Sequence, residues 1–194
     1  MPTEDDTQKQ PDVEATNGVS MIRFQGHNYR TSASKQMYIM RGVSGSGKSY
    51  TAKQLVGSGK IYSTDDYFMQ QGEYRFDPTK ISAAHEWNQR RVWNAAKRGV
   101  NPLVVDNTTT QAWEAKAYVV IGMDNGYDIE FVEPTSSWWQ KFRPNLSEPE
   151  LETLVEELAQ RNQHGVPAES IRRMLERWEH NIDPMTALRA TRPF

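Results

Sequence analysis

The sequence contains no cysteine among its 194 residues, and it contains no long apolar run. The absence of cysteine excludes a disulfide framework and a metal site built from thiolates, and it fits a reducing compartment. No stretch has the pattern of a secretion signal or the length of a membrane span. We therefore expect a soluble protein of the cytoplasm or the nucleus, with no membrane partner.

The sequence also lacks a large excess of charge of either sign, because its formal net charge is -2 at pH 7. Such a chain has no general attraction for nucleic acid, so a nucleic acid partner needs a local basic surface. The mean hydropathy of -0.79 is strongly polar, and we expect part of the chain to lie outside the core. We predict a disordered or loosely packed tail over residues 1–35, one domain over residues 36–182, and a C-terminal tail over residues 183–194. The tails are candidate contacts for other proteins.

One glycine-rich stretch, residues 42–49, fits the pattern G-x-x-x-x-G-K-[ST] at every fixed position. The apolar run at residues 37–40 before it is typical of a short strand, and residues 50–56 after it are compatible with a helix. This order of strand, loop and helix is the context in which the pattern forms a phosphate-binding loop, or P-loop. A flexible glycine and serine linker is the alternative, but a linker has no reason to lie between these two elements.

The predicted P-loop favours a polyphosphate because its backbone N–H groups and the N-terminus of the following helix converge on an anion. We expect Lys48 to reach the β- and γ-phosphates and the Ser49 hydroxyl to bind Mg²⁺. The cofactors indicated are ATP, with GTP as the alternative, and Mg²⁺. The candidate nucleotide-binding residues of this stretch are Gly42, Ser44, Gly45, Ser46, Gly47, Lys48, Ser49 and Tyr50.

Acidic residues follow two further segments that are typical of strands. Residues 60–64 are followed by Asp65 and Asp66, and the apolar run at residues 103–105 is followed by Asp106. Open α/β sheets bind ligands at the C-terminal ends of their strands, so these acids are candidates for the site. One acid of the pair could accept the proton of an acceptor hydroxyl, and Asp106 could hold Mg²⁺ together with Ser49. Helix capping is the alternative for each acid.

A long helix is predicted between these two strands, over residues 78–98. His85 and Asn88 lie on or beside its sheet-facing stripe. They either line an acceptor pocket or are polar residues whose hydrogen bonds are satisfied in the core.

The C-terminal part is helical, and its first helix is predicted from the capping pair Ser147 and Glu150 to Arg161. An arginine at the end of a helix that closes over the phosphates would neutralise charge on the transferred group. Arg161 is our candidate for this lid cation and for a further nucleotide-binding residue. The structural or substrate-side alternatives are Arg172, Arg173 and Arg177.

The alternation of strands and helices predicts an α/β fold with three layers, of the P-loop NTPase kinase type. We expect a mainly parallel sheet of four or five strands and a helical lid. Residues 127–132 form the fourth predicted strand, and their mixed polarity indicates a place near the edge of the sheet.

Residues 37–180 resemble the P-loop polynucleotide 5′-hydroxyl kinases. Besides the P-loop, the resemblance rests on Ser-Thr-Asp-Asp-Tyr at residues 63–67, Asp-Asn-Thr at residues 106–108, and Arg-Asn followed by Val-Pro within residues 161–167. Residues 63–68, 84–89 and 105–114 look closer still to the kinase-like domain of the Nedd-four-binding-protein-two proteins and their shorter paralogues. By this resemblance Asp65, rather than Asp66, is the general base. It also implies substrate-side roles for Asp65, Asp106, Asn107 and Thr108.

The resemblance implies ATP-dependent transfer of the γ-phosphate to the 5′-hydroxyl of RNA or DNA, with Asp65, Lys48 and Arg161 as catalytic residues. The alternatives are a P-loop kinase of a small-molecule alcohol, such as a sugar or nucleoside, and a nucleotide-dependent binding module without transferase activity. Two places depart from the family pattern. An arginine stands three positions after the first aspartate in well-known members, where this chain has Phe68, and a second lid arginine is replaced by a shorter segment that contains His164.

Overall fold

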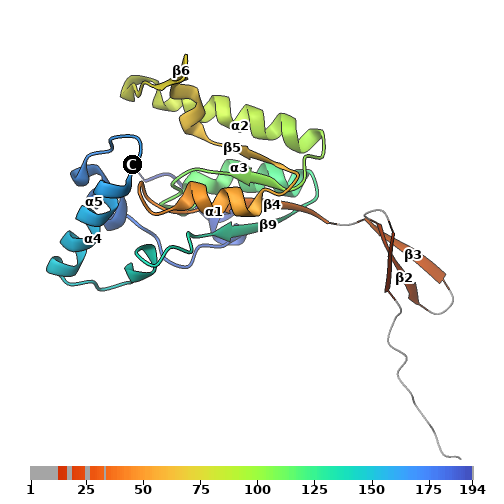
Figure 1. Ribbon diagram of the computed structural model, residues 1–194. Helices are drawn as coiled ribbons and strands as arrows, with labels where there is room; N and C mark the ends of the chain where they lie inside the picture. The colour runs from red at the N-terminus through yellow and green to blue at the C-terminus, as the bar shows by residue number, and fades with distance from the viewer. Residues whose placement is uncertain (1–12, 17–18, 25–26, 33, 194) are drawn as a thin grey trace, which may run out of the picture. The chain divides into compact units, whose positions relative to one another are not determined.

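The computed structural model describes residues 13–16, 19–24, 27–32 and 34–193 (Figure 1). The chain divides into two units, Met1–Ser34 and Lys35–Phe194, and each is described by itself. In the first unit, β1 (Val13–Thr16), β2 (Val19–Phe24) and β3 (His27–Ser32) form an antiparallel sheet in that order. These strands differ from the tail expected over residues 1–35, and residues 1–12 of that prediction lie outside the described residues.

The second unit is built on four parallel strands, paired in the order β5 (Lys60–Tyr62), β8 (Leu103–Val105), β4 (Lys35–Met40) and β9 (Tyr127–Val132). The chain passes from β4 to the edge strand β5, returns to β8, and then crosses to β9 on the other side of β4. The loops after β4, β5 and β8 therefore meet at one edge of the sheet, where α/β proteins bind ligands. The predicted fold class and the edge position of residues 127–132 are confirmed.

Helices and one hairpin connect these strands. The α-helices are α1 (Lys48–Leu55), α2 (Ile81–Lys97), α3 (Ala112–Asp124), α4 (Glu148–Arg161), α5 (Ala168–Glu176) and α6 (Pro184–Arg189). Short 3-10 helices are η1 (Thr64–Phe68), η2 (Pro78–Lys80) and η3 (Trp139–Lys141), and the hairpin is β6 (Met69–Gln70) with β7 (Glu73–Tyr74). Within the described ranges no helix has both the length and the apolar character that crossing a membrane requires.

The alternation of side chains along the strands divides the core into two faces. Met37 and Ile39 of β4 pack with residues of α2, α3 and α6, whereas Met40 packs on Ala52 of α1. Val104 of β8 belongs to the α1 face as well. The sheet thus lies between α1 on one side and α2, α3 and α6 on the other, which gives the three layers of Figure 1.

Helices α4 and α5 form the lid, and a second apolar cluster holds them together. Leu154 and Leu158 of α4 pack with Ile171 and Leu175 of α5, and all four belong to a cluster that includes Val43 in the loop after β4. The lid therefore packs directly on the loop that follows the central strand.

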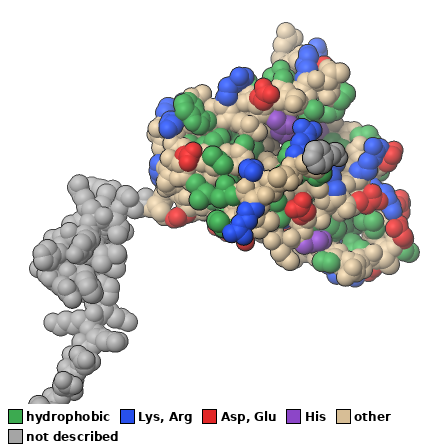
Figure 2. All heavy atoms as spheres, turned by 180° about the vertical axis from the view of Figure 1, so that it is seen from behind, with side chains coloured by type: hydrophobic (Ala, Val, Ile, Leu, Met, Phe, Trp, Pro, Cys, Tyr) green, Lys and Arg blue, Asp and Glu red, His purple; other side chains and the backbone are tan. Residues whose placement is uncertain are grey.

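Charged pairs add to the contact between the two lid helices. Arg172 of α5 donates to Glu152 at 2.8 Å and to Glu148 at 2.5 Å, both on α4, and to Glu176 of its own helix at 3.0 Å. Figure 2 shows acidic and basic side chains side by side at this edge of the molecule. Exposed pairs of this kind contribute little each, so the apolar cluster remains the main link.

The last helix, α6, lies within residues 183–194, where we expected a C-terminal tail. Asp183 caps it, because its carboxylate accepts a hydrogen bond of 2.7 Å from the Thr186 backbone N–H. Ala187 is fully buried in the cluster beneath α3, and the Lys116 ammonium donates to the Ala190 carbonyl at 3.1 Å. These contacts hold α6 on α3 and make it part of the domain.

The capping box of α4 predicts a pH dependence of stability. The Ser147 backbone N–H and hydroxyl donate to the Glu150 carboxylate at 2.9 Å and 2.7 Å, and Arg143 donates at 2.7 Å. These bonds lower the pKa of Glu150 to about 2 from its ordinary 4.5. Because the folded-state pKa is lowered, the stabilisation is present above pH 4.5 and is lost as the pH falls toward 2.

We expect Glu150→Gln to lower the urea midpoint at pH 6 and to have a smaller effect at pH 3, because the wild type has by then lost part of this stabilisation. Glu156→Gln, an exposed position on the same helix, is the matched control. An equal loss from Glu150→Gln at both pH values would contradict the interpretation.

Candidate active site

The loop between β4 and α1 has the conformation that a P-loop needs. Gly45 and Gly47 have φ values of 82° and 91°, in the left-handed region that side chains disfavour. Gly47 is the N-cap of α1, so the helix begins at Lys48 and its N-terminus faces the loop. A Cβ atom at Gly45 would lie 2.1 Å from the Leu158 carbonyl oxygen of α4. Glycine is required there both for its backbone conformation and for the close approach of the lid.

Asp106 lies beside the side chains of Lys48 and Ser49. The Lys48 ammonium is 2.5 Å from Asp106 Oδ1, and the Ser49 hydroxyl donates to Asp106 Oδ2 at 2.8 Å. The Asp106 backbone N–H donates to the Tyr62 carbonyl of β5 at 2.8 Å, which fixes the acid at the edge of the sheet. The structure thus brings the two predicted metal ligands into contact.

A hydroxyl and a carboxylate are the hard oxygen ligands that Mg²⁺ prefers, so Ser49 and Asp106 fit this ion. Among the residues that the structure describes, no group of three or more acidic, histidine or cysteine side chains could hold a metal. A Mg²⁺ ion held here would therefore take its remaining ligands from phosphate oxygens and water, as is usual at nucleotide sites.

The two adjacent acids after β5 point to different partners. Asp65 lines the cavity above the P-loop, whereas Asp66 forms an ion pair of 2.9 Å with Arg91 of α2. The Ser63 hydroxyl accepts a hydrogen bond from the Asp65 backbone N–H at 3.2 Å and starts the short helix η1. This geometry agrees with the expectation that one acid of the pair enters the site.

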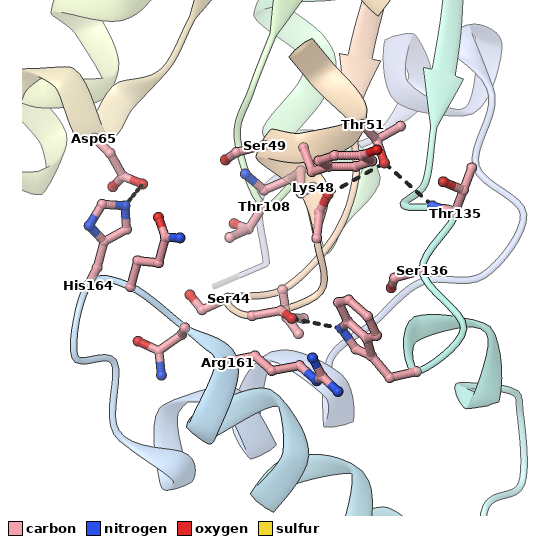
Figure 3. A pocket seen from close by; sticks show the side chains of 17 residues that line it. Ser44, Lys48, Ser49, Thr51, Asp65, Thr108, Thr135, Ser136, Arg161 and His164 are labelled. Atoms are coloured by element: carbon pink, nitrogen blue, oxygen red, sulfur yellow. Dashed lines mark hydrogen bonds and ion pairs between the residues drawn. The ribbon is translucent and has the colours of Figure 1, made fainter. Parts of the chain in front are cut away.

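Arg161 ends α4 at the opposite side of the cavity from Asp65, as Figure 3 shows. Its guanidinium carbon lies 3.8 Å from the centre of the Trp138 ring, and its NH2 group donates to Glu157 at 3.2 Å. The Trp138 indole N–H donates to the Gly45 carbonyl at 2.9 Å, so this stack rests on the P-loop.

The three alternative arginines have other partners. Arg172 and Arg173 form ion pairs with glutamates of the lid helices, and Arg177 donates to the Thr110 hydroxyl at 3.0 Å. Of the four predicted arginines, Arg161 is the one that lines the cavity.

The cavity has a volume of about 710 Å³. It is lined by most of the residues that the sequence singles out, namely Ser44, Gly45, Gly47, Lys48, Ser49, Tyr50, Asp65, Thr108 and Arg161. Lining residues that the sequence did not single out for the site are Val43, Thr51, Thr135, Ser136, Trp138, Asn162 and Gln163, while His164 was noted only as a departure. The predicted residues outside this lining are Gly42, Ser46, Asp106, Asn107, His85 and Asn88.

Asn88 and Asn107 belong to a buried network rather than to the cavity. Each donates a hydrogen bond of 3.1 Å to the Tyr118 hydroxyl, and Asn107 accepts one of 2.9 Å from the Thr64 backbone N–H. Burial raises the pKa of Tyr118, so its hydroxyl stays neutral. His85 is exposed on α2, with Nδ1 3.5 Å from the Thr64 hydroxyl. The core interpretation of Asn88 fits these contacts, and the substrate-binding interpretation of the three residues gains no support from them.

Arg41, which precedes the P-loop, is a buried cation that the sequence did not single out. It donates to the carbonyls of Thr109 at 3.0 Å, Thr110 at 3.2 Å and Glu179 at 2.7 Å. Burial lowers the pKa of Arg41 to about 10, so the side chain is still charged at neutral pH. The guanidinium also stacks on Trp178, with 4.1 Å from its carbon to the ring centre.

This fold and this site define a P-loop nucleotide-binding protein of the kinase type. A family model described as an AAA domain matches residues 37–181, and the chain belongs to this P-loop kinase-like family. Human NEDD4-binding protein 2 is 41% identical over 149 residues, which are 75% of this chain. The chain spans only 8% of the length of that relative.

The solved structures that are similar to the chain include the following two. A chain of the Pnkp1/Rnl/Hen1 RNA repair complex has a TM-score of 0.51 and 16% identity over 74% of this chain and 43% of its own. A gluconokinase from Sinorhizobium meliloti 1021 has a TM-score of 0.44 and 17% identity over 75% of both chains. The likeness to the first of these structures supports the fold alone.

The contact between the P-loop and the lid predicts a large loss of stability on Gly45→Ala. The substitution places a methyl group against the Leu158 carbonyl and adds the cost of the left-handed backbone, which is about 1 kcal/mol. Gly126→Ala is the matched control, because Gly126 has a φ of 72° and nothing within 4 Å of its Cβ position. We expect urea unfolding to show a loss of about 1 kcal/mol for the control and a clearly larger loss for Gly45→Ala. Equal losses of stability in the two variants would show that the close approach of Gly45 to the Leu158 carbonyl does not make glycine necessary there.

Proposed function

We propose that the chain is an ATP-dependent polynucleotide kinase that transfers the γ-phosphate to the 5′-hydroxyl of RNA or DNA. The observation that carries the proposal is the placement of Lys48, Asp65 and Arg161 around one cavity over the P-loop. A kinase that uses ATP as the phosphate donor needs a cation that binds the phosphates and a carboxylate that accepts the proton of the acceptor hydroxyl. It also needs a cation that stabilises the transition state. The resemblance of residues 63–67, 106–108 and 161–167 to the polynucleotide 5′-hydroxyl kinases supports this choice of acceptor.

Each group has one task in the proposed reaction. The P-loop amides and Lys48 bind the phosphates, and Ser49 with Asp106 would hold Mg²⁺, which supplies charge neutralisation at the phosphate oxygens. The acceptor oxygen forms a bond to the γ-phosphorus as the bond from that phosphorus to the β–γ bridging oxygen breaks. The hydroxyl proton passes to Asp65, ADP leaves, and Arg161 compensates charge on the transferred group.

Phe68 bears on how the acceptor is bound. In well-known polynucleotide kinases, the corresponding position holds an arginine that binds a phosphate of the nucleic acid strand. Its side chain is 1% exposed, and its ring lies 5.4 Å from that of Tyr67 and 5.1 Å from that of Phe76. Phe68 therefore cannot contact an acceptor phosphate, and the acceptor must be bound by other groups. Transfer to a small-molecule alcohol and nucleotide binding without transfer remain the competing functions.

Incubation with labelled ATP separates these functions. The acceptors are 5′-hydroxyl RNA, 5′-hydroxyl DNA, a nucleoside and gluconate, and GTP replaces ATP in a parallel series. The proposal requires label on an oligonucleotide 5′ end. Label only on a small molecule, or nucleotide binding without any labelled product, would each overturn it.

Asp65→Asn is expected to lower the transfer rate about 10²- to 10⁴-fold, because the amide cannot accept the acceptor proton. ATP affinity should stay within about threefold, because Asp65 is not a P-loop group. Lys48→Ala should weaken both ATP binding and transfer. Asp66→Asn is the matched control, since Asp66 is the adjacent acid and pairs with Arg91. Calorimetry and the labelling assay measure the two effects, and full activity of Asp65→Asn would remove this residue from the mechanism.

Arg161→Met keeps an apolar side chain against Trp138 but removes the cation. We expect the transfer rate to fall about 10³-fold, as for arginines that stabilise phosphoryl-transfer transition states. Arg173→Met is the control, because Arg173 is an exposed lid arginine that pairs with Glu169. Single-turnover kinetics report the rate. Wild-type rates for Arg161→Met would leave the lid without a catalytic cation.

A further inference from the structure

Two ring side chains, Tyr74 and His164, surround the carboxylate of Asp65. Tyr74 comes from the hairpin strand β7, and its hydroxyl donates to Asp65 Oδ1 at 3.3 Å. His164 comes from the loop that follows α4, and its Nε2 lies 3.9 Å from Asp65 Oδ2 (Figure 3). The two rings contact each other, with centres 4.2 Å apart and planes tilted by 35°. The hairpin and the lid loop thus meet at the acid.

The two oxygens of Asp65 are in different situations. Oδ1 is occupied by the Tyr74 hydroxyl, which fixes the rotation of the carboxylate. Oδ2 faces His164 at a distance that is too long for a direct hydrogen bond. A single hydroxyl oxygen that lies about 2 Å to the side of the line joining Oδ2 and Nε2 would be about 2.8 Å from both atoms, which is hydrogen-bond distance on each side. One acceptor oxygen can therefore bridge the two atoms from the cavity side.

We propose that the acceptor hydroxyl bridges Asp65 Oδ2 and His164 Nε2 from the cavity side, and that Tyr74 is a positioning residue that holds Asp65 for it. This inference rests on the proposed function. The hydroxyl donates its proton to Oδ2 and accepts a hydrogen bond from Nε2–H, which leaves one lone pair of its oxygen for the phosphorus. His164 then contacts the substrate from the same lid segment that carries Arg161 three residues earlier. One segment of the lid thus places the cation on the side of the phosphates and the imidazole on the side of the acceptor.

The surroundings of Asp65 support a small, built position rather than an open acidic surface. The Asp65 side chain is 49% exposed and that of His164 is 40% exposed, so an acceptor can reach both. Besides Tyr74 and His164, the ionisable groups on the elements around Asp65 include Asp66 and Tyr67 of η1, Glu73 of β7, and His85 and Arg91 of α2. Burial and then Asp65 raise the pKa of Tyr74, which keeps its hydroxyl protonated as a donor.

Steady-state kinetics with a 5′-hydroxyl oligonucleotide test the two roles. For Tyr74→Phe we expect kcat to fall about tenfold with the KM for ATP unchanged, because only the orientation of the base is lost. For His164→Ala we expect the KM for the acceptor to rise about tenfold, and His164→Gln, which keeps an N–H donor at similar reach, to recover part of it. Tyr67→Phe is the matched control, because Tyr67 packs on Phe68 in the same aromatic cluster, whereas the hydrogen bond to Asp65 Oδ1 comes from Tyr74. Wild-type constants in Tyr74→Phe and His164→Ala, with both variants folded by urea titration, would overturn the proposal.

A second measurement needs no activity. Because Asp65 raises the pKa of Tyr74, Asp65→Asn should let the Tyr74 phenol ionise at lower pH, which NMR with ¹³C-labelled tyrosine detects. Tyr50, which is 68% exposed at the P-loop, serves as the internal reference. If the wild type phosphorylates no acceptor but Tyr74 shifts, the proposed function fails while the contact between Tyr74 and Asp65 stands. If the Tyr74 phenol titrates identically in the wild type and in Asp65→Asn, the contact between Tyr74 and Asp65 is contradicted, and so is the positioning role of Tyr74.

Discussion

A buried positive charge fixes the parts of the site relative to one another. Arg41 stands at the end of β4, and its guanidinium donates to carbonyls of the loop after β8 and of Glu179 after α5. A buried cation costs several kcal/mol unless its donors are satisfied, so these segments must keep their places for the charge to be tolerated. The Gly42 backbone N–H donates to the Thr108 carbonyl at 2.9 Å and closes the same junction. These hydrogen bonds fix the distance between the P-loop and Asp106.

The P-loop side and the Asp65 side of the cavity are held by different kinds of contact. On the nucleotide side, Gly45 touches the α4 backbone, Trp138 donates to the P-loop, and Val43 lies in the apolar cluster of the lid. On the acceptor side, the contacts reach Asp65 from a two-residue strand and from the loop that contains His164. Regions with few buried contacts open most readily, so movement is expected to concentrate in the exposed hairpin residues 69–73 and in the exposed loop residues 163–165.

The sequence predicted those parts of the site that depend on local patterns. The P-loop, the acid after each strand and the ends of the helices are encoded within a few residues, and the parallel sheet follows from the strand and helix order. Trp138 and Tyr74 could not be assigned in this way, because they meet Gly45 and His164 about 90 residues away in the chain. Two local signals were overlooked: Asp183-Pro184 at the start of α6, and Asn17-Gly18 in the sequence between β1 and β2.

The two departures from the kinase pattern meet at Tyr74. Phe68 replaces a cation of the family, and its buried ring lies 6.2 Å from that of Tyr74, which in turn stacks on His164 at the second departure. An arginine at position 68 would place a charge inside this aromatic cluster and separate Tyr74 from its support. A cation in place of His164 would lose the ring stack on Tyr74. The two replacements are therefore mutually consistent, because together they build the hairpin contact that holds Asp65.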